Sequence, residues 1–95
     1  MELREIPFET TDWAQVAATE RPGASGMVRS RTRQLGDIRV RMVDYSPGYL
    51  ADHWCDKGHI LLCLEGVLHT ELSDGSRVVL LPGMSYQVAD NTAAH

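Results

Sequence analysis

The sequence predicts an all-β domain, in the form of a small antiparallel barrel. Apolar and polar side chains alternate along several short segments, which is the pattern of half-buried strands. In a barrel every second residue points into a closed interior, so this fold is suited to binding. From Met27 onward, turn-forming residues recur about every 8 to 12 positions, as in sandwiches and barrels: Gly36, Pro47-Gly48, Lys57-Gly58, Gly66, Asp74-Gly75, Pro82-Gly83 and Asp90-Asn91.

Length and charge limit the classes of function. The 95 residues make one domain, and the net charge of -4 argues against a nucleic-acid or anionic-membrane partner. No apolar run matches a signal peptide or the roughly 20 residues that span a bilayer. The two cysteines, Cys55 and Cys63, are therefore expected to be reduced thiols in a cytoplasmic protein.

Residues 1–26 are expected to form an N-terminal arm that packs on a barrel domain over 27–95. Thr11 and Asp12 precede a segment that begins at Trp13, and either side chain suits the cap of a short helix. The same segment also fits an irregular arm that lays Trp13 on the core, so both forms stay open. Residues 21–26, with Pro22 and two glycines, are typical of a loop and not of a helix or a central strand.

The next two predicted strands carry most of the basic side chains. Three arginines spaced two apart share one face of the first strand. In an acidic protein the simplest interpretation is that this face is exposed to solvent. On the second strand, Arg41 and Tyr45 share one side, either at the mouth of a pocket or against water. The residues that set this pattern are Arg29, Arg31 and Arg33, then Ile38, Val40 and Met42 with Arg39 between them.

Four further strands are expected over 60–64, 67–72, 77–81 and 84–89. The second and third are joined by a hairpin turn at 73–76, which contains Asp74 and Gly75. Cys63 lies in an apolar run and is expected to be a packed core thiol. His69 falls on the polar side of its strand, so we expect it to face solvent.

Three residues that commonly bind transition metals lie within seven positions, at His53, Cys55 and His59. His53 and Cys55 are two apart, so on an extended strand both side chains project to the same face. The turn-forming residues 56–58 then bring His59 back beside them. This spacing predicts a hairpin that directs all three donors to one point.

The pattern resembles the first motif of the cupin family, which runs from a Pro-Gly turn through His-x-His to a Glu and then a Gly. Pro47-Gly48, His53, Cys55, His59 and Gly66 fall at the corresponding places, with Cys55 replacing the second His and His59 replacing the Glu. Residues 52–55 also resemble the motif of the DHCW-motif cupins, with Trp and Cys in the opposite order. The resemblance covers roughly residues 38–95 and implies a cupin-like double-stranded β-helix, or jelly roll.

The second cupin motif is matched more loosely over 82–95. Gly83 corresponds to its leading glycine and His95 to its distant histidine, while the internal Pro and Gly are missing. The resemblance implies His95 as a fourth metal ligand, and a rival alignment places Tyr86 there instead. The chain stops at His95, where the family barrel has a further strand. Either the final strand is lacking or the barrel closes by pairing with a second chain as a homodimer.

The resemblance implies one divalent transition metal held by His53, Cys55, His59 and His95. A thiolate with imidazoles favours zinc, nickel, iron or copper over magnesium or calcium. A small-molecule ligand or substrate would bind beside the metal, with Tyr86, Tyr49 and Arg41 as pocket candidates.

Two classes of function remain open from the sequence. The cupin family includes oxygenases, isomerases and lyases, and the resemblance does not choose among them or decide whether the chain is an enzyme. The alternative is a non-catalytic module, either a ligand or metal sensor or a structural zinc barrel. A metal with exchangeable positions favours the enzyme, and a closed tetrahedral zinc site favours the structural role.

Overall fold

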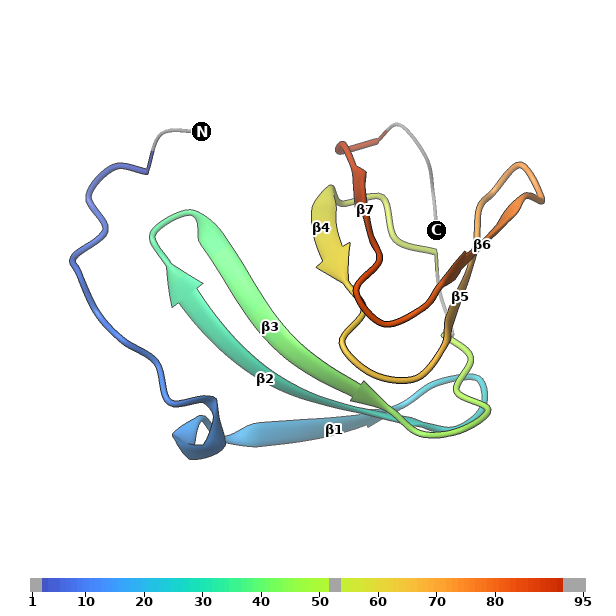
Figure 1. The fold of residues 1–95 in the computed structure, drawn as a ribbon, viewed down its shortest axis with the longest axis horizontal. Coiled ribbons are helices and arrows are strands. Elements are labelled where there is room, and N and C mark those ends of the chain that lie inside the picture. Colours follow the sequence, from blue (N-terminus) through green and yellow to red (C-terminus); the bar gives the residue numbers. More distant parts are fainter. Residues whose placement is uncertain (1–2, 52–53, 92–95) are drawn as a thin grey trace. The chain divides into compact units, whose positions relative to one another are not determined.

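The computed structural model describes residues 3–51 and 54–91, and Figure 1 shows its strands. The regular structure of these residues is all-β apart from one short 3-10 helix, so the predicted class is confirmed. Hydrogen bonds join the described strands into three small antiparallel sheets and do not close them into a barrel. The chain divides into two compact units, Met1–Asp52 and His53–His95. The division predicted at residue 26 stays a prediction.

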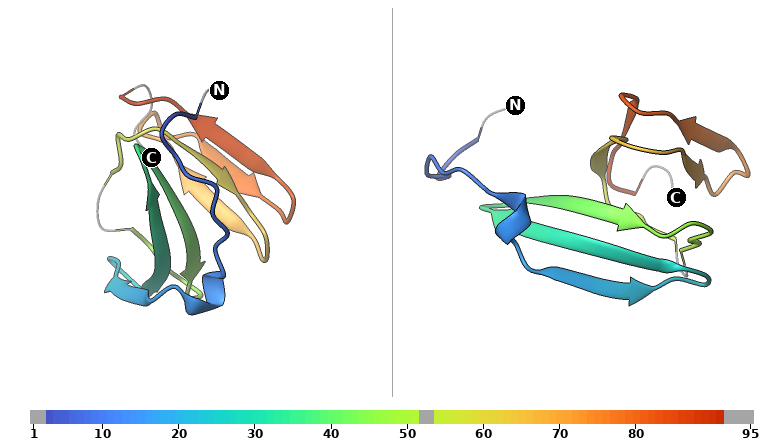
Figure 2. Two further views of the ribbon diagram at one scale, coloured as in Figure 1. Left: turned by 90° about the vertical axis from the view of Figure 1, so that its left-hand side faces the viewer. Right: turned by 60° about the horizontal axis from the view of Figure 1, so that its bottom comes forward.

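The first unit contains a three-stranded antiparallel sheet in the order β1-β2-β3. Its strands are β1 (Ala18–Pro22), β2 (Met27–Leu35) and β3 (Ile38–Tyr45), which lie side by side in Figure 2. A two-residue turn joins β2 to β3, because Leu35 pairs with Ile38. Gly36 begins this turn with φ 59, a conformation that glycine adopts without the penalty of a Cβ atom.

Strand β1 was not predicted. Pro22 is its last residue and pairs with Met27, so the loop expected over 21–26 begins only after Pro22. Proline has no N–H to donate, and it is tolerated here because β1 lies at the edge of the sheet.

A single helical turn, η1 (Trp13–Gln15), precedes this sheet. The Asp12 side chain caps it by accepting a hydrogen bond of 3.1 Å from the N–H of Ala14. The short helix and the irregular arm left open by the sequence are therefore both partly right, since one helical turn lies in an otherwise irregular segment.

The N-terminal segment covers part of the arginine face of β2, so the solvated face that we expected holds for Arg29 and is wrong for Arg31 and Arg33. The Arg31 guanidinium donates to carbonyl oxygens of η1 and of Val16, the residue that follows it. Arg33 forms an ion pair of 3.2 Å with Glu9. The three carbonyls bonded by Arg31 belong to Trp13, Ala14 and Val16, at 3.2, 3.4 and 2.6 Å.

We expect Arg31→Met to lower the free energy of unfolding by about 1–2 kcal/mol, because it removes charge-assisted hydrogen bonds to three carbonyls. Arg29→Met is the matched control on the same face of β2. Arg29 is exposed, so its replacement should cost less than about 0.5 kcal/mol. Urea denaturation measures both variants, and equal losses would contradict the role given to Arg31.

The second unit consists of two antiparallel strand pairs. β4 (His59–Leu62) pairs with β7 (Ser85–Val88), and β5 (Leu68–Glu71) pairs with β6 (Arg77–Leu80). These strands confirm the four predicted segments; each is shorter than predicted, and β4 begins one residue earlier, at His59. The hairpin between β5 and β6 is also confirmed, since the N–H of Leu72 donates to the Ser76 carbonyl at 2.8 Å.

Half-buried or buried side chains alternate with exposed ones along the strands of the second unit, and the less exposed side chains form its inner face. His69 is exposed and Cys63 is 6% exposed, as the sequence predicts. The Thr70 and Tyr86 hydroxyls lie 3.5 Å apart, so the inner faces of the two strand pairs meet. The inward side chains are those of His59, Leu61, Leu68, Thr70, Val78, Leu80, Tyr86 and Val88.

The β5–β6 turn is fixed by Asp74, whose Oδ1 accepts hydrogen bonds from the N–H and the hydroxyl of Ser76 at 2.8 and 2.6 Å. These bonds lower the pKa of Asp74 below its ordinary value. A carboxylate with a depressed folded pKa stabilises the protein above its unfolded pKa, and this stabilisation is lost as the pH falls through the folded value.

We therefore expect Asp74→Asn to lower the melting temperature at neutral pH. The difference from wild type should shrink as the pH falls through the folded pKa of Asp74, and it should vanish once Asp74 is protonated in both the folded and the unfolded wild type. Thermal melts at several pH values measure the difference. A difference that stays constant down to acid pH would contradict the role of the charged carboxylate.

Candidate metal site

The side chains of Cys55 and His59 meet at one backbone oxygen. The Cys55 Sγ lies 4.0 Å from the Lys57 carbonyl oxygen, and the His59 Nδ1 lies 3.2 Å from the same atom. Both side chains are half-buried. Two of the four predicted ligands thus contact one shared atom. The other two, His53 and His95, lie outside the described residues.

The loop that carries Cys55 differs from the prediction. Residues 54–58 form no strand, so the hairpin expected to present Cys55 is not formed by them. The loop instead pairs with the turn after β7. The N–H of Gly58 donates to Asp90 Oδ1 at 2.6 Å, and the N–H of Asn91 donates to the Asp56 carbonyl at 2.8 Å. These bonds use backbone groups that a hairpin partner would otherwise need.

Gly58 allows the loop to lie this close to the end of β7. A Cβ atom at position 58 would lie 2.7 Å from the Val88 carbonyl oxygen and 2.8 Å from the Asp90 nitrogen. Both neighbours are backbone atoms and cannot rotate away. The position of the Cys55 loop therefore depends on a glycine at residue 58.

Tyr86 lies beside His59 on the inner face of the β4–β7 pair. The ring centroids are 5.8 Å apart, with 50° between the ring planes. The Tyr86 hydroxyl also contacts the Thr70 hydroxyl of β5. Thr70 was not predicted as a site residue, although its alternation with Leu68 already placed it on the inner face. The Lys57 carbonyl was missed as well, because a backbone oxygen leaves no signal in a sequence.

The other two pocket candidates, Tyr49 and Arg41, belong to the first unit. The Tyr49 ring packs on Tyr45, with ring centroids 4.9 Å apart. Arg41 is exposed and pairs with Thr32 across the β2–β3 ladder. Arg41 and Tyr45 lie on the same side of β3, as their spacing predicts.

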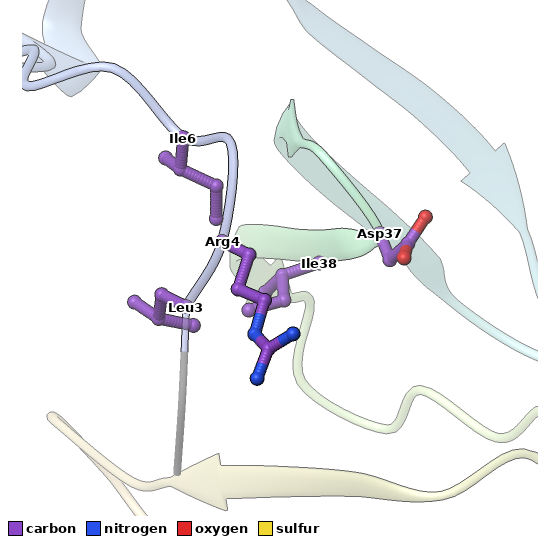
Figure 3. Close-up of a pocket in the computed structure, with 5 residues that line it drawn as sticks. All are labelled: Leu3, Arg4, Ile6, Asp37 and Ile38. Atoms are coloured by element: carbon purple, nitrogen blue, oxygen red, sulfur yellow. The ribbon is translucent and has the colours of Figure 1, made fainter.

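A pocket of about 230 Å³ lies in the first unit, between the N-terminal segment and the β2–β3 turn (Figure 3). Three aliphatic side chains line it together with one arginine and one aspartate. The sequence did not predict this pocket, because its two walls come from segments about 30 positions apart that carry no motif. The lining residues are Leu3, Arg4, Ile6, Asp37 and Ile38.

The donor types at Cys55 and His59 suit a transition metal. Thiolate and neutral imidazole are ligands for zinc, iron, nickel and copper and poor ligands for magnesium and calcium. Within residues 3–51 and 54–91, no group of three or more His, Cys, Asp or Glu side chains is arranged to hold a metal ion. Those ranges contain Cys55 and His59 of the four predicted ligands.

Comparison with family models, curated proteins and solved structures finds no match to this chain. In the described part of the chain, no helix is both long enough and apolar enough to cross a membrane.

Proposed function

We propose that this chain is a cupin-like metal-binding protein in which His53, Cys55, His59 and His95 hold one divalent transition metal ion. The meeting of the Cys55 thiol and the His59 imidazole at the Lys57 carbonyl carries the proposal. The thiol comes from the loop and the imidazole from the first residue of β4, and both are donor types that such a metal site uses.

The course of the chain supports the other two ligands. His53 precedes Cys55 by two positions, and His95 follows Asn91 by four. The N–H of Asn91 is bonded to the Asp56 carbonyl, in the loop that carries Cys55. Four residues span up to about 13–14 Å, so the chain is long enough for His95 to reach this loop. Tyr86, beside His59, is the rival for the fourth position.

A bound divalent ion would polarise a ligand oxygen or activate a water molecule. Cys55 must lose its proton to bind a metal, so metal binding ends any donation from its thiol to the Lys57 carbonyl. That oxygen then accepts from the His59 side chain. The Tyr86 and Thr70 hydroxyls supply polar groups on the inner face for a small-molecule ligand.

A structural zinc site is the second candidate, because the Cys55 loop has no regular secondary structure. Two hydrogen bonds, from Gly58 to Asp90 and from Asn91 to Asp56, attach the loop to the turn after β7. An ion bound by Cys55 and His59 would fix the loop to β4 and so stabilise the second unit.

Elemental analysis tests both candidates on the full chain, purified without metal-chelating resin. We expect one transition metal ion per chain. Iron or nickel that exchanges readily supports an open ligand-binding site, and zinc that resists chelators supports the structural role. Failure to retain zinc, iron, nickel or copper after loading would contradict the proposal.

A further inference from the structure

We infer that the Lys57 carbonyl and the Tyr86 ring are positioning groups for His59, which hold its imidazole in the Nδ1–H tautomer with Nε2 as the metal-binding atom. The metal part of this inference rests on the proposed function. The tautomer and the ring orientation are properties of the chain without metal.

The tautomer follows from the chemistry of the Lys57 contact. A carbonyl oxygen only accepts hydrogen bonds, so the 3.2 Å contact with Nδ1 requires the proton to be on Nδ1. In a neutral imidazole the lone pair is then on Nε2, which is the nitrogen able to ligate a metal. Acceptors of this kind commonly set the tautomer and the ring direction of metal-binding histidines.

Tyr86, on the neighbouring strand β7, contacts the His59 ring. Leu61 pairs with Tyr86 and His59 pairs with Val88, so the His59 and Tyr86 rings are diagonal neighbours on one face of the β4–β7 pair. The contact of the Tyr86 hydroxyl with Thr70 links its ring to the opposite sheet. His59 is thus held by the loop through Lys57 and by β7 through Tyr86.

Nitrogen NMR of the histidine side chains tests the tautomer on the metal-free full chain, at a pH where imidazoles are neutral. A His59→Gln variant assigns the signal. We expect the Nδ1–H form, and an Nε2–H form or an even mixture would overturn the inference. On adding zinc, we expect the Nε2 signal to shift as the coordinating nitrogen.

The two proposals fail in different ways. An Nδ1–H tautomer in a protein that retains none of zinc, iron, nickel and copper supports the positioning role and contradicts the proposed function. Zinc bound through Nδ1 overturns the positioning role and leaves the proposed function standing.

Variants at Tyr86 test the ring contact. Tyr86→Phe keeps the ring but loses the contact with the Thr70 hydroxyl, so it should weaken zinc affinity about two- to threefold, whereas Tyr86→Leu should weaken it about tenfold and reduce the Nδ1–H population. Equal affinities for the two variants would overturn the role of the ring. If the Tyr86→Leu variant does not fold, Thr70→Val provides a second test, because it removes only the hydroxyl contact. We expect Thr70→Val to weaken zinc binding about two- to threefold, and an unchanged zinc affinity would contradict the role of Tyr86.

Discussion

Gly58→Ala is expected to displace the Cys55 loop and to lower the free energy of unfolding by about 1–3 kcal/mol. The new methyl group would overlap the Val88 carbonyl oxygen and the Asp90 nitrogen, which as backbone atoms move only if β7 or the loop moves. Zinc affinity should fall with the stability, because Cys55 and His59 flank this residue. Denaturation and zinc titration of the same preparation measure both effects.

Gly66→Asn is the matched control within the second unit. No atom lies within 4 Å of a Cβ at position 66, and asparagine tolerates the φ of 73 found there. We expect this variant to cost less than about 1 kcal/mol and to keep the zinc affinity of wild type. A Gly58→Ala protein that binds zinc as tightly as this control would show that the loop position does not matter for the site.

The second large effect is expected from the two cysteines, which differ in role. Cys55→Ser should weaken metal binding by more than about 100-fold, since loss of a ligand costs more than loss of a group that only orients one. The stability of the metal-free protein should change by less than about 0.5 kcal/mol, because Cys55 lies in a half-buried loop.

Cys63→Ser should show the opposite result. Cys63 is 6% exposed, and its Sγ lies 3.5 Å from the Glu65 carbonyl oxygen. The serine hydroxyl gains that acceptor but gives up an apolar contact, so we expect a loss of about 1 kcal/mol with metal binding unchanged. Equal losses of metal from the two variants would contradict the assignment of Cys55 as the ligand.

Local patterns predicted the strands of the second unit. His69 faces outward and its neighbours Leu68 and Thr70 face inward, because the side-chain period of a strand is a property of adjacent residues. The Asp74-Gly75 turn was equally local. By contrast, the contact of Gly58 with Asp90 joins positions 32 apart, and no local pattern reports it. The predicted hairpin around Cys55 was wrong for this reason.

In the first unit, the strand at β3 was predicted, but the half-buried face expected for it was not found, since Val40 and Met42 are exposed. The surroundings of β2 were not predicted either. Arg31 and Arg33 were predicted to face solvent, because the alternation of side chains along one strand does not show which other segment covers that strand. The cover comes from residues 9–16, whose carbonyls and Glu9 satisfy the guanidinium groups. Strand β1 was missed because Pro22 is acceptable only at an edge, and the sequence does not show which strand is the edge.

The metal and pocket roles of the candidate residues stay predictions. The structure places the Cys55 and His59 side chains against the same carbonyl oxygen, that of Lys57, and the Tyr86 ring beside the His59 ring. Tyr49 and Arg41 belong to the first unit, so their part in the pocket stays a prediction, as do the roles of His53 and His95. The Lys57 carbonyl, where the two donors meet, could be found only from the structure.

Cys55 and His59 are predicted to bind the same ion, and X-ray absorption of the zinc-loaded full chain tests this most directly. We expect one sulfur at about 2.3 Å and imidazole nitrogen at about 2.0 Å from each zinc. The sulfur signal should disappear in Cys55→Ser and persist in Cys63→Ser. A wild-type spectrum with nitrogen and oxygen neighbours and no sulfur would contradict the site.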